Sequence, residues 1–168
     1  MNVPRMLAGA RSSALQRWWA NFLLPWIIPF NRPHGFKVVP LKEGGMSVEI
    51  PYWRINQNHV RGIHACALAT AAEMCSGLGV LELVDPRQYR MIMRELNMNY
   101  HYQAKKRTIA RARPAASEIE AQVLQPLLGA DSVDYTSMVE LHDVAGNHIA
   151  TGTVTWQMKP WSKVRTKV

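Results

Sequence analysis

The sequence predicts an α+β domain in which an antiparallel sheet wraps around one long helix. Three observations carry this prediction. A run of small and apolar residues from Val60 to about Gly77 is long enough for a central helix. Several later segments alternate apolar and polar residues with the period of two that half-buried strands show. Five alanines within "ACALATAA" let such a helix lie very close to a curved sheet.

Length and composition fit a single folded domain. The chain has 168 residues, of which 48% are hydrophobic, and this excludes a disordered protein. We divide it into an N-terminal helical extension (1–34), the sheet-and-helix domain (35–160) and a basic C-terminal tail (161–168). A formal charge of +8 favours an anionic partner: nucleic acid, a phosphate-bearing cofactor or an acidic membrane surface.

The N-terminal extension is basic and apolar, with no Asp or Glu among the first 42 residues. Its segment "RWWANFLLPWIIPF" is too short to span a bilayer and contains Pro25 and Pro29, which predicts one or two short, interrupted apolar helices. Two interpretations stay open. The helices pack on the fold or on a partner subunit, or they make peripheral membrane contact through Trp18, Trp19 and Trp26.

The two cysteines indicate a reducing compartment. Cys66 and Cys75 are nine residues apart in the predicted central helix, a separation of ~13 Å that excludes a disulfide between them. We interpret them as reduced core cysteines of a cytoplasmic protein, which is membrane-peripheral if the N-terminal helices contact lipid.

Strand patterns lie on both sides of the central helix. Two short β-like runs flank Gly44 and Gly45, a predicted hairpin turn. Residues 96–103 alternate with a period of two, and residues 105–114 continue the sheet pattern.

The C-terminal part predicts one more helix and a long hairpin. Ser117 and Glu120 have the spacing of a capping box, which predicts a helix over 117–129 with a kink near Pro126. Two long alternating segments follow, joined by a reverse turn at 144–147.

Three polar residues around the central helix have a recognisable spacing. Asn58 stands six residues before His64, and Glu73 stands nine residues after it. This arrangement resembles the hotdog-fold acyl-CoA thioesterases, in which an Asn precedes a His-Gly-Gly sequence and an acid follows on the central helix. The closing "HDVAGNHIATGTVTW" also resembles the Asp-x-x-Gly hairpin of that superfamily.

The resemblance extends from about residue 36 to residue 160. It is strongest to a phenylacetate-pathway-thioesterase-like branch with extra N-terminal helices, and it implies a hotdog fold and thioester hydrolysis. The chain departs from the pattern at two points. Ala65 and Cys66 replace the two glycines, and the acid is Glu rather than the commoner Asp.

The chemistry of thioester hydrolysis suits these residues. Negative charge develops on the carbonyl oxygen, and an unpaired N–H at a helix N-terminus, such as that of Ala65, can stabilise it. Glu73 is the only acid in the predicted helix, which makes it the candidate general base or nucleophile. Asn58 and His64 are candidates for positioning substrate or water.

Helix geometry predicts that the site needs two subunits. Glu73 lies ~13 Å along the helix from His64 and about half a turn around it, so both cannot reach one carbonyl within a chain. A symmetric homodimer, or a dimer of dimers, brings the helix start of one chain to Glu73 of another. The resemblance implies the same, because hotdog thioesterases build their sites between subunits.

Each candidate has a structural alternative. Glu73 could pair with Arg54 or Arg61, His64 could simply cap the helix, and Asn58 could only shape its loop. We expect His59 to face solvent. The histidine and cysteine spacings match no zinc motif, so we predict no metal site.

A cluster of cations is the candidate site for the phosphates of coenzyme A. The alternative is a solvated edge strand protected from aggregation by its charges. Nucleic-acid binding is not expected, because no aromatic residues alternate with the cations as a base-stacking platform requires. The cluster comprises Lys105, Lys106, Arg107, Arg111 and Arg113.

The sequence thus predicts a homodimeric hydrolase of acyl-CoA or a related pantetheine thioester. It needs no cofactor beyond the coenzyme A moiety of the substrate. The alternative is a non-catalytic hotdog protein that binds acyl-CoA or lipid. Apolar residues that permit a pocket for the acyl chain are Met74, Leu78, Leu81, Met91 and Met93.

Overall fold

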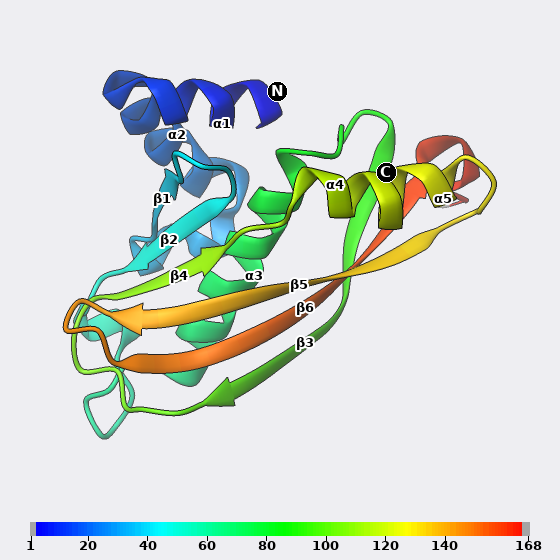
Figure 1. The fold of residues 1–168 in the computed structure, drawn as a ribbon. Helices are drawn as coiled ribbons and strands as arrows, with labels where there is room; N and C mark the ends of the chain where they lie inside the picture. The colour runs from blue at the N-terminus through cyan, green and yellow to red at the C-terminus, as the bar shows by residue number, and fades with distance from the viewer. Residues whose placement is uncertain (1–2, 166–168) are drawn as a thin grey trace.

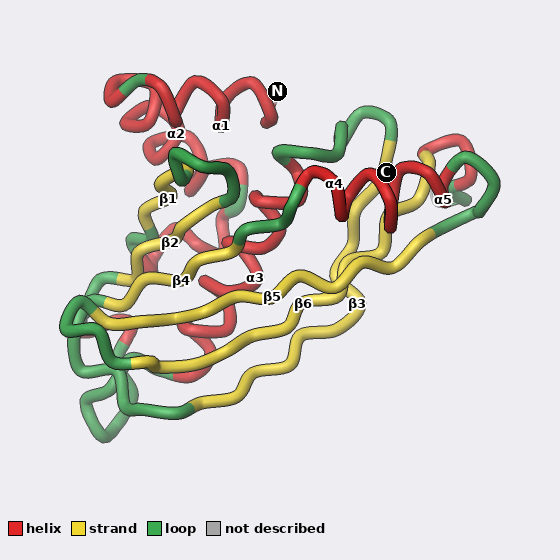
Figure 2. Tube along the Cα trace, viewed as in Figure 1, coloured by secondary structure: helices red, strands yellow, loops and turns green. Residues whose placement is uncertain are grey.

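The computed structural model describes residues 3–165, so the ends of the predicted N-terminal extension and C-terminal tail lie outside it. Its six strands form one antiparallel sheet in the order β1-β2-β4-β5-β6-β3, which curves around the central helix α3 (Figures 1 and 2). The predicted α+β class and central helix are confirmed. The strands are β1 (Lys37–Pro40), β2 (Met46–Ile50), β3 (Tyr89–Tyr100), β4 (Thr108–Ala112), β5 (Val133–Asp143) and β6 (His148–Pro160).

Helix α3 (Ala65–Leu81) begins five residues later than the sequence predicts. The preceding residues form a tight loop instead, because the side-chain oxygen of Asn58 accepts hydrogen bonds from the amides of Val60 (3.1 Å) and Gly62 (2.9 Å). Arg61 adopts a left-handed conformation in this loop (φ 58°), which no helix accommodates. The predicted start at Val60 is therefore wrong.

The end of α3 is also displaced, because Gly77 does not terminate it. A Cβ atom at position 77 would lie 2.9 Å from the ring of Trp156 on β6, so the glycine serves close helix–sheet packing rather than helix termination. Gly79 approaches Pro114 in the same way. Two interior glycines are tolerated here because tertiary packing offsets their low helix propensity.

Strand β3 begins at Tyr89, well before the predicted strand at 96–103. Its register with β6 shifts between Met93 and Glu95, which marks a β-bulge. The inward positions therefore change phase, from Met91 and Met93 before the bulge to Leu96 and Met98 after it. Because a single period of two does not describe the whole strand, its first half was missed.

The segment after β4 is helical, but not in the predicted manner. It consists of α4 (Ala116–Ile119), a π-helical turn (Glu120–Leu124) and α5 (Gln125–Leu127). The predicted capping box does not form, because the N-cap is Ala115 and no side chain caps the helix. The wide turn stands directly before Pro126, which has no N–H to continue the α-helical hydrogen bonds.

The two predicted hairpins are confirmed. Strands β1 and β2 pair across the Gly44–Gly45 turn, and β5 and β6 pair across the turn at 144–147. In the second turn the carboxylate of Asp143 accepts hydrogen bonds from the amides of Ala145 and Asn147, both at 2.9 Å. Gly146 supplies the positive φ (89°) that the turn requires.

The N-terminal extension forms α1 (Val3–Ser12), α2 (Ala14–Ile27) and a 3₁₀ helix (Pro29–His34). The predicted interruption at Pro25 is wrong, since α2 continues through it. The side chain of Asn21 donates to the Val38 carbonyl (2.8 Å) and accepts from the Val38 amide (2.6 Å). An α2 side chain thus takes the place of a neighbouring strand and covers the β1 edge of the sheet (Figure 1).

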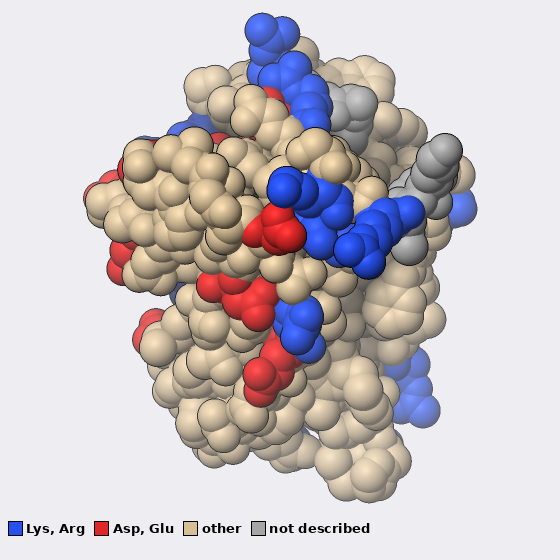
Figure 3. All heavy atoms as spheres, turned by 90° about the vertical axis from the view of Figure 1, so that its right-hand side faces the viewer, with Lys and Arg blue, Asp and Glu red and all other residues tan. Residues whose placement is uncertain are grey.

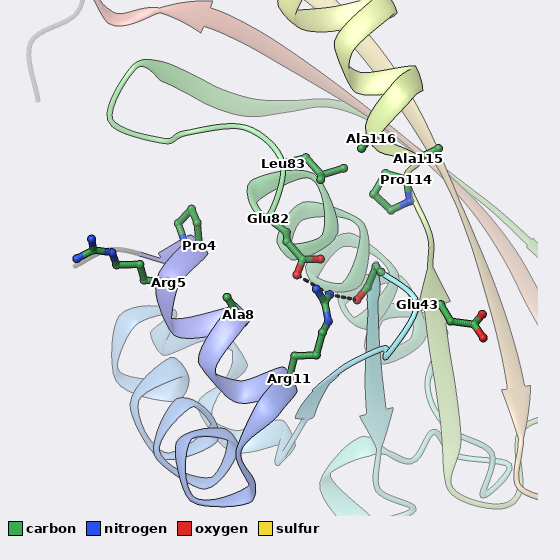
Figure 4. A pocket seen from close by; sticks show the side chains of 12 residues that line it. Pro4, Arg5, Ala8, Arg11, Glu43, Glu82, Leu83, Pro114, Ala115 and Ala116 are labelled. Carbon is green, nitrogen blue, oxygen red and sulfur yellow. Dashed lines mark hydrogen bonds and ion pairs between the residues drawn. The ribbon is translucent and has the colours of Figure 1, made fainter.

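Arg11 clamps α1 to the body of the protein. Its guanidinium forms an ion pair with Glu82, the residue that follows α3, and hydrogen bonds to the carbonyl oxygens of Leu41 and Gly45. Arg11 lines a concavity of about 610 Å³ between α1 and the end of α3. Figure 4 shows its side chain reaching from α1 toward Glu82. No helix within residues 3–165 has the length and apolar character needed to cross a bilayer.

Candidate active site

Helix α3 packs against the sheet, and most of its residues are buried. Its uncovered residues repeat at intervals of three and four, the spacing of a single helix face. Cys66 is exposed, and the three residues that follow on the same face are half-buried. We call this face the α3 stripe; it comprises Cys66, Ala69, Thr70 and Glu73.

Glu73 is a carboxylate without a cation. No ion pair and no hydrogen bond to its side chain occurs within residues 3–165, so the alternative of pairing with Arg54 or Arg61 is wrong. Burial raises the pKa of the Glu73 carboxyl above its ordinary value. A desolvated and uncompensated carboxylate is a stronger proton acceptor than a solvated or paired one.

The first turn of α3 presents a free amide. His64 is the N-cap, and its Nδ1 accepts from the Cys66 amide at 3.1 Å, while its carbonyl accepts from Ala67 and Leu68. The Ala65 amide has no acceptor anywhere in the described part of the chain, and Ala65 is exposed. An unpaired backbone N–H of this kind can stabilise an oxyanion.

His64 therefore does form the helix cap that was considered as its structural alternative. Because Nδ1 accepts the capping hydrogen bond, the neutral ring carries its proton on Nε2. The side chain is exposed, which leaves that N–H available to a bound molecule. His59, as expected, is also exposed.

The loop before α3 brings two of the predicted cations close to the helix start. The Ile63 amide donates to the Ala104 carbonyl at 2.7 Å, and Gln103 donates to the Val60 carbonyl at 3.3 Å. The connection from β3 to β4 is thereby fixed beside the Asn58 loop. Lys105 and Lys106 follow directly in this connection, and both are exposed.

The other three predicted cations lie on the outer face of the sheet. Arg107 pairs with Glu49 at 3.1 Å, and Arg111 stands opposite Glu140 in the register of β4 and β5. Ile109 and Arg111 are partly exposed, whereas the residues that alternate with them in β4 are buried toward α3. Arg111 and Arg113 border a small outer concavity with Met138 and Glu140. These arginines are therefore separated from Glu73 by the sheet.

The inner face of β3 extends the α3 stripe into a wider uncovered surface. β3 is an edge strand with no neighbour on its outer side. Met93 and Tyr100 point inward, opposite Trp156 and Ala150 of β6, yet they are 41% and 48% exposed. The Tyr100 hydroxyl donates to the Ala65 carbonyl at 3.1 Å, which joins this strand to the start of α3.

Sequence reasoning missed Cys66 and Tyr100 as parts of this surface. Cys66 was interpreted as a core cysteine, but it is exposed, whereas Cys75 is buried and burial raises the pKa of its thiol to about 12. The spacing of Cys66 and Glu73, seven residues, was the signal that both lie on one helix face.

Two further observations concern the charges of the molecule. Within residues 3–165, no group of three or more His, Cys, Asp or Glu side chains is placed to hold a metal ion. Basic and acidic side chains are intermingled on the face at the right-hand side of Figure 1 (Figure 3). That face therefore presents no surface of a single sign.

A family model described as a domain of unknown function (DUF4442) matches residues 17–158. The chain belongs to this family. A search of curated proteins found no match. The family domain includes α2 from residue 17 onward and most of the sheet, so the tryptophans of the N-terminal extension lie within it.

Solved structures share the fold. A Pseudomonas aeruginosa protein described as a probable thioesterase is 24% identical, with a TM-score of 0.77 over 84% of this chain and 94% of that one. A mutant thioesterase of the same organism is 17% identical (TM-score 0.63; 78% and 86% covered). A thioesterase of Haemophilus influenzae is 14% identical (TM-score 0.60; 77% and 82% covered). The predicted hotdog fold is confirmed.

Proposed function

We propose that the protein hydrolyses acyl-CoA, or a related pantetheine thioester, at a site shared by two copies of the chain. The observation that carries this proposal is the state of Glu73. A half-buried carboxylate with a raised pKa and no cation costs stability, and such groups concentrate at sites where a proton is moved.

The shared site follows from helix geometry. Glu73 lies eight residues, or ~12 Å, along α3 from Ala65, too far for both to contact one thioester carbonyl. A two-fold axis near Ala69, in the middle of the stripe, places the helix start of one copy beside Glu73 of the other. The small side chain of Ala69 permits a close approach, and the partner covers the exposed part of β3.

In this arrangement the two groups have separate roles. Glu73 of one copy takes a proton from water, and the water oxygen bonds to the carbonyl carbon. Alternatively, the Glu73 carboxylate attacks that carbon itself and forms a mixed anhydride, which water then hydrolyses to release the acid and restore Glu73. The Ala65 amide of the other copy donates a hydrogen bond to the developing oxyanion. The C–S bond then breaks, and the thiolate of coenzyme A leaves and takes up a proton. His64 Nε2–H and the Asn58 amide group are donors that hold substrate or water nearby.

The phosphates and the acyl chain need separate surfaces. Among the five predicted cations, Lys105 and Lys106 stand nearest to the start of α3, because their connection is bonded to the loop that precedes it. We assign the phosphates to these two lysines. The acyl chain lies against the inner side of β3, where Met93 and Met98 provide adaptable apolar contacts.

The experiment that tests this proposal measures hydrolysis of a series of acyl-CoA thioesters by the full chain and by Glu73→Gln. The variant removes the base or nucleophile and leaves a side chain of the same shape, so we expect turnover to fall by at least ~100-fold. Glu140→Gln is the matched control, since it removes one carboxylate from the outer face of β5, away from α3.

Three outcomes would contradict the proposal. If Glu73→Gln keeps the activity of the unmodified protein, the chemistry lies elsewhere. If the unmodified protein binds acyl-CoA but hydrolyses none of the series, the alternative of a non-catalytic binding protein is correct. A monomer in sedimentation at micromolar concentration would rule out the shared site.

A further inference from the structure

We infer that α2 docks the protein on the surface of an anionic lipid bilayer. The inference does not depend on the proposed function, because it concerns the opposite edge of the sheet. The N-terminal helices cover β1, whereas the uncovered α3 stripe adjoins β3, the strand at the other edge.

The apolar side of α2 that faces outward is the first observation. Ala20 and Leu24 are buried against the body of the protein. On the other side, five large apolar residues succeed one another at helical spacing, and Phe30 of the following 3₁₀ helix continues the series. Each of the six is between 49% and 69% exposed. We call them the aromatic stripe: Leu15, Trp18, Trp19, Phe22, Trp26 and Phe30.

Three rings of the aromatic stripe, those of Trp18, Trp19 and Phe22, are in mutual contact. The ring centroids of Trp18 and Trp19 are 4.9 Å apart, and Trp18 stacks on Phe22 at 5.7 Å. A contiguous exposed apolar patch on a folded protein marks an interaction surface. The core of this fold does not bury these rings, because the opposite side of α2 makes the contacts with β1.

The charges around the aromatic stripe indicate an anionic partner. No acid occurs in the first 42 residues. The Arg32 guanidinium lies 3.9 Å from the ring centroid of Trp26, and both side chains are exposed. Lys37, at the start of β1, is exposed as well. Tryptophan with arginine at one boundary is the composition of helices that lie at the interface of an anionic membrane.

The dimensions fit a helix lying in the plane of the membrane. With 14 residues, α2 is ~21 Å long, shorter than the ~30 Å of a bilayer core. The ion pair from Arg11 to Glu82 holds the preceding helix α1 on the folded domain, and the hydrogen bonds from Asn21 to Val38 hold α2 there. The helix therefore presents its rings as a fixed surface and needs no unfolding to insert them.

The experiment is cosedimentation of the full chain with vesicles of phosphatidylcholine, alone or with about one third phosphatidylglycerol. We expect binding to the anionic vesicles, with a blue shift of tryptophan emission. The triple variant Trp18→Ser/Phe22→Ser/Trp26→Ser should bind at least ~100-fold more weakly, because it removes the apolar area that the membrane would bury. Arg32→Gln should weaken binding roughly fivefold to anionic vesicles only.

Two matched variants separate this surface from the rest of the molecule. Leu128→Ser/Met138→Ser removes two apolar side chains that are 79% and 62% exposed elsewhere, and it should bind like the unmodified protein. Glu73→Gln should bind the anionic vesicles as the unmodified protein does. The vesicle experiment therefore tests membrane binding independently of thioester hydrolysis.

Two results would overturn the inference: the absence of binding to either type of vesicle, or equal binding by the triple variant. If the unmodified protein does not bind vesicles and the triple variant forms a smaller assembly in size-exclusion chromatography, a second copy of the chain covers the aromatic stripe.

Discussion

Helices α2 and α3 differ in which of their sides is buried. α3 is enclosed by the sheet, and the side it leaves uncovered carries a carboxylate and small residues. α2 is a surface helix, and the side it leaves uncovered is its most apolar one. In each helix the uncovered residues are those that folding of one chain does not require. The comparison teaches that the apolar side of a helix need not be its buried side.

The largest expected effect in this comparison concerns the start of α3. Ala65→Pro deletes the amide to which we assign the oxyanion, and the helix tolerates the change, because proline is favoured at the first helical position. The preceding His64 already has the extended conformation that proline demands (φ −62°, ψ 140°). We expect turnover of acyl-CoA to fall by ~10²–10³-fold with unchanged circular dichroism.

Ala116→Pro is the matched control, since Ala116 is the first residue of α4 and follows an extended Ala115. An equal loss of turnover in both variants would show that proline acts through folding. Coexpression of Ala65→Pro with Glu73→Gln sharpens the test. Random mixing should restore about a quarter of the original activity, because half of the dimers are mixed and each has one intact site. No restoration would place the site within one chain.

The second effect is on stability and compares two adjacent residues of α2. Leu24 is 3% exposed against the β1 edge, whereas Leu23 is 38% exposed. Leu24→Ala leaves a cavity and should lower the free energy of unfolding by about 3 kcal/mol, while Leu23→Ala should change it by less than about 1 kcal/mol. Urea titration followed by circular dichroism measures both free energies of unfolding. Equal losses would contradict the conclusion that Leu24 lies on the buried side of α2 and Leu23 does not.

The fold could be predicted because its main signals are local. The helix with five alanines, the two hairpins and the spacing of Asn58, His64 and Glu73 are all visible in the sequence. The boundaries that failed depended on contacts distant in the sequence. The close approach of the Trp156 ring requires a glycine at position 77, and the bulge after Met93 arises from the pairing of β3 with β6.

The candidate site was predictable only in part. Residue type and spacing made Glu73 and the helix start candidates, because chemistry restricts which groups can act in thioester hydrolysis. The sequence did not separate Lys105 and Lys106 from the three arginines, because only the fold places them on different sides of the sheet. It also left the environment of Glu73 open, since the absence of a cation is a property of tertiary structure.

The third effect follows from that separation of the cations. Lys105→Gln/Lys106→Gln should raise the KM for acyl-CoA about tenfold, because two charge-assisted phosphate contacts are lost. Arg111→Gln/Arg113→Gln removes the same charge from the outer face and should change KM little. A short pantetheine thioester has no phosphates, so neither variant should affect its hydrolysis, and added salt should shrink the difference for acyl-CoA. The opposite ranking would move the phosphates to the outer face.

The smallest expected effect is a gain in stability from removing Glu73. Burial raises the pKa of this carboxyl in the folded state, so the folded protein binds more protons than the unfolded chain at pH values between the two pKa values. Stability is therefore lost as the pH rises through this window, and the loss persists above it. Glu73→Gln has no such titration, so its melting temperature relative to the unmodified protein should rise from pH 4 to pH 7, by about 1–3 °C. Glu140→Gln, compared at equal protein concentration, should show no such rise. If Glu73→Gln is less stable than the unmodified protein at pH 7, Glu73 stabilises the fold. That result would contradict the claim that the uncovered residues of α3 are not required for folding.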